Sequence, residues 1–249
     1  MAKLTVLDMV QDILSDLDSD EVNSINDTIE ATQVAQIIKT TYFNIIDGKD
    51  WPFLFQFFQL DSSINPARPN YMKLPESVVN VETIKYNKRL ITDTFDRYTD
   101  VTYKTPEEFL DIVNARHSDA TNVLVVTDAS LVKLNIFNDK APSYFTSFDD
   151  EYLVFDSYDS DVDTILQTSK TQCHGKVRPT FSMTDIFVPD LPVQMFSYLL
   201  NEAKSTCFLI LKQAPNQKAE QHSISQRRRM SQEAWRIKNG VTYPNYGRK

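Results

Sequence analysis

Apolar residues recur at helical spacing in two stretches near the N-terminus. In the first, Val6 to Leu17, they fall at positions i, i+3 and i+4, and Thr5 is placed to cap the helix. In the second, Glu21–Phe53, Asp27 is placed to cap a longer helix, with Glu30 three residues later completing a capping box. One apolar stripe follows, formed by Val34, Ile37, Ile38, Tyr42, Ile45 and Ile46. The two stretches therefore predict a pair of antiparallel helices.

The sequence also indicates where the second helix ends. Gly48 follows the last apolar position, where a left-handed C-terminal residue is favoured. Trp51-Pro52-Phe53 then forces an extended exit, because proline disfavours helix at the residue before it. We expect these three residues to be structural anchors where the helices meet the next domain.

The pattern changes between residues 54 and 188. Short apolar or alternating runs predict strands, whereas Thr105-Pro106 predicts the start of a helix that ends near Arg116. The expected strands lie in the runs at Phe55–Leu60, Tyr71–Pro75, Val78–Tyr86, Val123–Val126, Leu131–Phe137, Tyr144–Phe145, Glu151–Phe155 and Thr180–Met183. This region is therefore predicted to be mostly β.

Helical spacing returns after Pro189-Asp190-Leu191-Pro192 and continues to about Gln213. A weaker helical pattern follows at Lys218–Trp235, with Pro215 expected to break the two. Residues 239–249 carry two glycines and a proline and are predicted to be a tail.

These elements predict an α+β fold, in which a helical bundle formed by the N- and C-terminal helices holds an inserted β-rich domain. The expected divisions are an N-terminal helix pair (1–53), the inserted domain (54–188), the C-terminal helices (189–236) and an extended tail (237–249).

Composition narrows the possible functions. Only four glycines occur in 249 residues, far below the usual ~7%, and none are spaced for a dinucleotide fingerprint, a phosphate loop or a nucleophile elbow. No apolar run reaches the ~18 residues of a transmembrane helix, and the N-terminus is too acidic for a signal peptide. Cys173 and Cys207 lie outside any zinc-binding pattern, which favours a reducing compartment and no metal or cofactor.

Charge is distributed unevenly. Residues 1–30 carry a net −7, residues 201–249 carry +7, and the whole chain carries −8. The two ends are electrostatic complements that could meet within a subunit or between neighbouring subunits, or stay as two separate solvated faces.

Three groups of residues have side chains suited to catalysis or metal binding. The acidic run Asp156, Asp159, Asp161 and Asp163 could ligate a divalent cation, but an EF-hand would need glycine and glutamate where Thr164 and Lys170 stand, so a solvated loop is favoured. Cys173 and His174 are neighbours that should point to opposite faces of a strand, with His117 and His222 the remaining imidazoles. Carboxylate pairs such as Glu107-Glu108 or Asp149-Asp150-Glu151 fit a helix start and a surface turn better than a glycosidase site. We therefore predict no catalytic residues.

The C-terminal region holds the strongest basic cluster. Arginine binds anions and tryptophan can stack on a base, so contact with DNA or with an acidic protein partner is conceivable. A sequence pI of about 4.9 favours a protein partner. The candidate partner-binding residues are Arg227, Arg228, Arg229, Trp235, Arg236, Tyr243 and Tyr246.

The order of these elements resembles the head-to-tail adaptor, or tail tubular protein A, family of short-tailed bacteriophages. The resemblance rests on the helix pair ending in W-P-F, the segment 143–161, the late polar strand within 166–181 and the long helix within 187–213. It implies a non-enzymatic virion protein of the neck, made in the host bacterial cytoplasm. The implied assembly is a dodecameric ring between the portal protein and the tail nozzle protein. Genomic DNA would pass through this ring without sequence-specific binding, and the protein would have no membrane partner. The helices and the C-terminal tail would contact the portal, and the β-rich end would support the nozzle.

Two other classes of protein remain open. One is a virion-associated cell-wall hydrolase, which glycan cleavage would reveal. The other is a β module that binds a polysaccharide or receptor, for which the aromatic run Phe53–Phe58 could serve as a platform.

Overall fold

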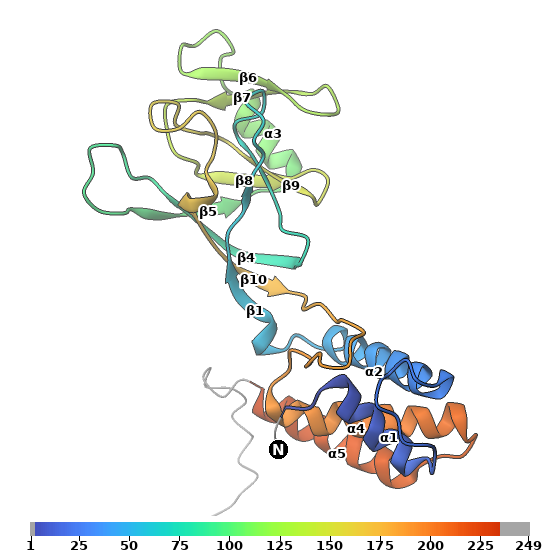
Figure 1. The fold of residues 1–249 in the computed structure, drawn as a ribbon. Helices are drawn as coiled ribbons and strands as arrows, with labels where there is room; N and C mark the ends of the chain where they lie inside the picture. The colour runs from blue at the N-terminus through green and yellow to red at the C-terminus, as the bar shows by residue number, and fades with distance from the viewer. Residues whose placement is uncertain (1–2, 235–249) are drawn as a thin grey trace, which may run out of the picture. The chain divides into compact units, whose positions relative to one another are not determined.

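A computed structural model describes residues 3–234, which divide into two compact units (Figure 1). The first, here called the helical unit, comprises residues up to Leu54 together with those from Pro179 onward. The second, the sheet unit, comprises Phe55–Arg178.

The helical unit is built from α1 (Val6–Asp16), α2 (Ile29–Asp47), α4 (Val193–Leu211) and α5 (Gln217–Glu233), with a short 3-10 turn, η1 (Pro52–Leu54). α4 packs against the other three helices. Residues from both chain ends form one apolar core, in which Val10, Ile38, Tyr42, Phe196 and Leu199 are fully buried. None of the described helices is both long enough and apolar enough for a bilayer crossing.

The expected caps are partly correct. Thr5 caps α1 and exchanges hydrogen bonds with Asp8 in a capping box. In α2 the cap is Thr28, not Asp27, because the Asp27 carboxylate already accepts the backbone N–H groups of Asn23 and Ser24. Gly48 ends α2 with right-handed geometry rather than the expected left-handed one.

The sheet unit contains an eight-stranded sheet, a separate two-stranded hairpin, helix α3 (Pro106–Asn114) and the short turn η2 (Thr168–Lys170). The sheet order is β1-β10-β4-β5-β8-β9-β3-β2, with β5 and β8 parallel and every other pair antiparallel. Its strands are β1 (Phe55–Phe58), β2 (Asp61–Ser62), β3 (Tyr71–Lys73), β4 (Val78–Asn87), β5 (Tyr98–Tyr103), β8 (Tyr144–Ser147), β9 (Tyr152–Phe155) and β10 (Thr171–Val177). The hairpin pairs β6 (Val123–Thr127) with β7 (Lys133–Phe137).

Gly175 has a clear role in this sheet. The register of β10 against β4 shifts at His174/Gly175, and the two backbones approach closely there. A Cβ at position 175 would collide with the carbonyl oxygen of Asn80, so only glycine fits.

The predicted fold class is wrong. The described residues form a mixed α/β fold with a large curled sheet of eight strands and five helices, rather than a helical bundle with a small inserted β domain. The sheet was underestimated because most of its strands have only two to six residues and pair across long sequence distances. β5 was missed entirely, since its burial pattern leaves Val101 as the one buried residue.

The segment after β10 differs from the expectation in two ways, because it was predicted to contain a strand and to belong to the inserted domain 54–188. Thr180–Met183 forms no strand, and this segment belongs to the helical unit, where Phe181, Met183 and Phe187 pack against the core. The backbone N–H of Val6 donates to the carbonyl of Phe187 at 2.9 Å, so the segment is also fixed by hydrogen bonds to the start of α1.

Candidate functional site

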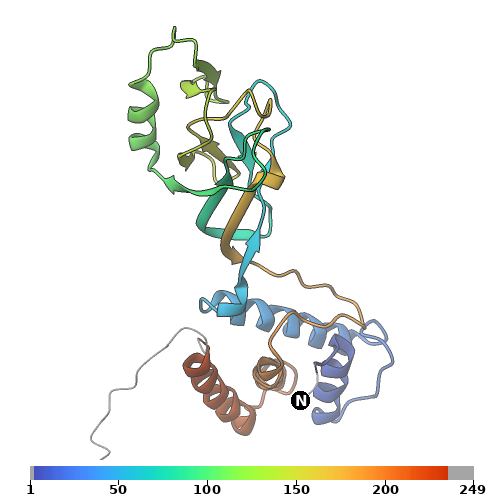
Figure 2. The same ribbon diagram turned by 90° about the vertical axis from the view of Figure 1, so that its left-hand side faces the viewer.

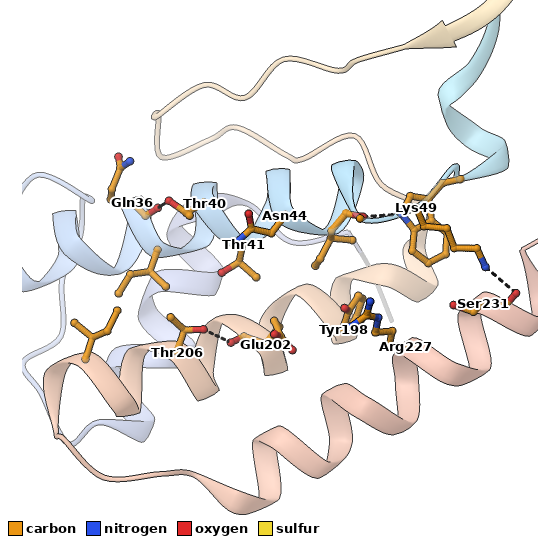
Figure 3. Close-up of a pocket in the computed structure, with 15 residues that line it drawn as sticks. Gln36, Thr40, Thr41, Asn44, Lys49, Tyr198, Glu202, Thr206, Arg227 and Ser231 are labelled. Atoms are coloured by element: carbon orange, nitrogen blue, oxygen red, sulfur yellow. Dashed lines mark hydrogen bonds between the residues drawn. The ribbon is translucent and has the colours of Figure 1, made fainter. Parts of the chain in front are cut away.

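The helical unit contains a groove of about 370 Å³ between α2, α4 and α5 (Figure 3). α2 forms one wall, α5 forms the other, and α4 lies between them. The residues that line this α2–α5 groove are Gln36, Ile37, Thr40, Thr41, Asn44, Ile45, Gly48, Lys49, Trp51, Tyr198, Glu202, Thr206, Ile210, Arg227 and Ser231.

α5 is held against α4 by polar as well as apolar side chains. Its mean hydropathy is low, and Ala219 and Met230 are its buried apolar residues. Ser223 Oγ instead donates to the Glu202 carboxylate of α4, and Gln226 Nε2 donates to Ser197 Oγ at 2.5 Å. α5 packs mainly on α4 rather than on α2, which leaves the groove between α2 and α5.

Trp51 closes one end of the groove. Its side chain is only 4% exposed, and its indole Nε1 donates to the carbonyl of Ile45 at 2.7 Å. The ammonium group of Lys49 lies 5.3 Å from the centre of the Trp51 ring and donates to the carbonyl of Ser231 at 3.1 Å. Lys49 therefore ties the end of α2 to the end of α5.

The chemistry of the groove suits non-covalent binding. Ile37, Ile45 and Ile210 supply apolar surface, while Glu202 and Arg227 supply opposite charges. Burial raises the pKa of Tyr198, Glu202 adds to the increase and Arg227 opposes it, so the phenol stays neutral and can donate a hydrogen bond. Such a surface can hold a partner segment with one apolar side and a polar edge.

The structure separates the predicted partner-binding residues. Arg227, Arg228 and Arg229 are all exposed on α5, and of these only Arg227 lines the groove. Consecutive positions on a helix point in different directions, so the three cannot serve one ligand together. Trp235, Arg236, Tyr243 and Tyr246 lie outside the described residues.

The predicted anchors Trp51, Pro52 and Phe53 lie directly before the boundary between the two units. Trp51 belongs to the core of the helical unit, and Phe53 is half-buried against that core with its ring centre 6.5 Å from the indole. Leu54, which the sequence analysis did not single out, is 1% exposed in the same core.

The acidic residues between Asp156 and Asp163 do not share one environment. Asp156 is buried and pairs with Arg116, whose Nη2 lies 2.8 Å from Asp156 Oδ2. Asp163 instead pairs with Lys170 at 2.5 Å. Residues 3–234 contain no group of three or more histidine, cysteine or acidic side chains placed to hold a metal ion.

The Cys173–His174 neighbours have different surroundings. Cys173 is 1% exposed in the core of the sheet unit, whereas His174 is partly exposed, with Nδ1 3.0 Å from Glu82 Oε2. Of the other carboxylates considered, Glu107 and Glu108 lie in the first turn of α3 and Glu108 forms a salt bridge with Lys104. Asp149 accepts the backbone N–H groups of Glu151 and Tyr152 in a surface turn.

Both thiols are expected to be unreactive in the native protein. Burial raises the pKa of Cys173 and of Cys207 to about 12, and only the thiolate attacks disulfide reagents. At about pH 8 the native protein should react with an aromatic disulfide at least ~100-fold more slowly than the unfolded chain, whose thiols have ordinary pKa values. The reaction is measured by absorbance with and without urea; rapid reaction of one thiol in buffer would contradict the burial of that cysteine.

The two charged chain ends meet at one described point. Lys204 of α4 bridges two carboxylates of α1, at 2.9 Å from Asp12 and 2.6 Å from Asp16. Burial alone would lower the pKa of Lys204, but the two carboxylates outweigh it and the pKa is raised. The lysine is therefore charged at neutral pH, and part of the predicted complementarity is used within one subunit.

Comparisons with known proteins add no relative to this description. No protein-family model matches the chain, and a search of curated proteins finds no significant match.

Proposed function

We propose that this protein is a structural subunit of a head-to-tail adaptor ring in a short-tailed bacteriophage. It would join the portal to the tail nozzle, line part of the DNA channel and catalyse no reaction. One observation supports this proposal above the others: the segments that carry the resemblance, Glu21–Phe53 and 187–213, fold around one core, although more than a hundred residues separate them.

The division into two units fits a protein that must contact two different rings. In the helical unit, the α2–α5 groove with its exposed Arg227 is the candidate portal-binding surface. Trp235, Arg236, Tyr243 and Tyr246, which lie outside the described residues, follow α5 in the sequence and are proposed to take part in the same contact.

A candidate nozzle-binding surface lies on the sheet unit. The loop between β4 and β5 carries three exposed apolar side chains, Leu90 (47%), Ile91 (78%) and Phe95 (62%). Several large apolar side chains at the tip of one loop favour a contact with another protein. We therefore assign this loop, 88–97, to the nozzle side of the adaptor.

Deleting residues 237–249 should weaken portal binding at least tenfold, because tyrosine and arginine contribute strongly to protein interfaces. The melting temperature should change little, since both described cores lie within residues 3–234. Binding is measured by native mass spectrometry with purified portal rings of the same virus, and the melting temperature by circular dichroism.

The matched control keeps the full chain and replaces Leu90, Ile91 and Phe95 with serine. This variant should retain portal binding and lose binding to the purified nozzle protein. A full-length chain that binds neither ring, or that cleaves peptidoglycan, would overturn the proposed function. If the full-length chain instead binds duplex DNA with an affinity that falls steeply with salt, and the chain lacking residues 237–249 does not, the C-terminal segment is a nucleic-acid interface.

A further inference from the structure

The helical unit has an acidic flank formed by α1 and the loop that follows it. Asp8, Asp12 and Asp16 recur every four residues along α1, so they lie on one stripe of the helix. Asp18, Asp20 and Glu21 follow in the loop, and all six acidic residues are exposed. Lys204 offsets part of this charge through Asp12 and Asp16. The acidic flank thus keeps a clear excess of negative charge.

The same unit has a basic flank on α5. Ala219, Ser223 and Met230 are the buried positions of this helix, and helical geometry places Arg228 on the side opposite to them. Lys218 is also exposed, and it lies on the side of α5 that does not line the α2–α5 groove. The basic flank therefore faces away from the core, separate from the groove.

The helices that carry the two flanks lie on either side of α4. α4 packs against both α1 and α5, and Figure 2 shows α4 between them. α4 thus separates the exposed charges of α5 from those of α1 in the same chain. Surfaces of opposite charge on opposite sides of one subunit are the arrangement that head-to-tail contacts require, and such contacts form rings when the rotation closes.

We infer that the basic flank of α5 docks on the acidic flank of α1 in a second copy of this chain. The inference rests on the proposed function, because it names the contact by which the ring subunits would join. A single exposed ion pair contributes little to the free energy of association, so the contact needs several pairs together and is weakened by salt. Lys218 and Arg228 would face Asp18, Asp20 and Glu21 of the neighbour.

Charge reversal tests this pairing without the portal or the nozzle. An acid-reversed variant carries Asp20→Lys and Glu21→Lys, and a base-reversed variant carries Lys218→Glu and Arg228→Glu. In the contact itself, the acidic segment Asp18, Asp20 and Glu21 changes from −3 to +1 in the first variant, and the pair Lys218 and Arg228 changes from +2 to −2 in the second. The two contact segments of each variant then have like charge, so each variant alone should associate at least tenfold more weakly than the wild type. An equimolar mixture pairs basic with acidic flanks again, and should recover the wild-type association to within about threefold.

Sedimentation velocity at about 50 mM and about 500 mM salt measures the association, which should weaken at the higher salt. The control variant, Glu76→Lys with Lys133→Glu, reverses exposed charges of the sheet unit and should behave like the wild type. A wild type that stays monomeric at low salt and high concentration overturns the inference, as does a mixture that fails to associate. If the wild type stays monomeric but still binds portal rings, the inference fails and the proposed function survives. If the mixture of the two variants associates but the wild type does not bind portal rings, the proposed function fails and the inference stands.

Discussion

Replacing Arg116 with methionine should destabilise the sheet unit by about 3–5 kcal/mol, because it leaves a carboxylate buried without its cation. Asp156 is 2% exposed and the Arg116 side chain 8% exposed, so water cannot replace the lost partner. Arg116 also donates through Nη1 to the carbonyl oxygens of Asn135 and Asp156 and lies 4.0 Å from the centre of the Phe137 ring. Urea unfolding followed by circular dichroism measures the effect.

The double variant Arg116→Met, Asp156→Asn is the matched control. An asparagine oxygen can still accept the backbone N–H groups of Ser143 and Tyr144, which donate to Asp156 Oδ1 at 2.9 Å each. The double variant should therefore be more stable than Arg116→Met alone, although it has lost both charges of the pair. If Arg116→Met unfolds within about 1 kcal/mol of the wild type, the ion pair has no structural role.

Replacing Trp51 with alanine should cost the helical unit about 3–5 kcal/mol. The indole is buried in the core, donates to the carbonyl of Ile45 and supports the ammonium group of Lys49, which reaches α5. Its removal lowers the melting temperature and leaves a cavity at the end of the α2–α5 groove, so the proposed function also predicts weaker binding to portal rings. Thermal unfolding measures the first effect and binding to portal rings the second.

Two variants separate packing from hydrogen bonding at this position. Trp51→Phe keeps most of the apolar volume and loses the indole N–H, so it should cost only about 1–2 kcal/mol. Phe53→Ala removes a half-buried ring from the same cluster and should cost less than Trp51→Ala. A Trp51→Ala protein that melts at the wild-type temperature would show that the indole does not contribute to the core.

The sequence predicted the local features of the helices well. In α1, Thr5 and the apolar stripe from Val6 specify both the start of the helix and its buried face, because a cap and a helical period involve neighbouring residues. The cap of α2 was misassigned because Asp27 and Thr28 are adjacent and both are good capping residues. Only the structure shows that Asp27 is used by the preceding loop.

Features that depend on distant residues could not be predicted in this way. The Arg116–Asp156 pair joins residues forty positions apart, and nothing near either residue distinguishes it from an exposed charge. The α2–α5 groove likewise requires three helices to pack, and its residues Gln36, Thr40 and Thr206 look like ordinary surface positions in sequence. The eight-stranded sheet was not predicted for the same reason, since strands as short as β2 are too short to show an alternation of apolar and polar residues.

The discontinuous core of the helical unit has a consequence for the order of folding. α1 and α2 are complete early in synthesis, but Met195, Phe196 and Leu199, which cover their apolar faces, come after the whole of 55–178. At roughly 5–20 residues per second, the ribosome needs several seconds or more to reach α4. The sheet unit, which is continuous in sequence, is thus able to fold first, while the N-terminal helices stay exposed to chaperones until the C-terminal helices are released.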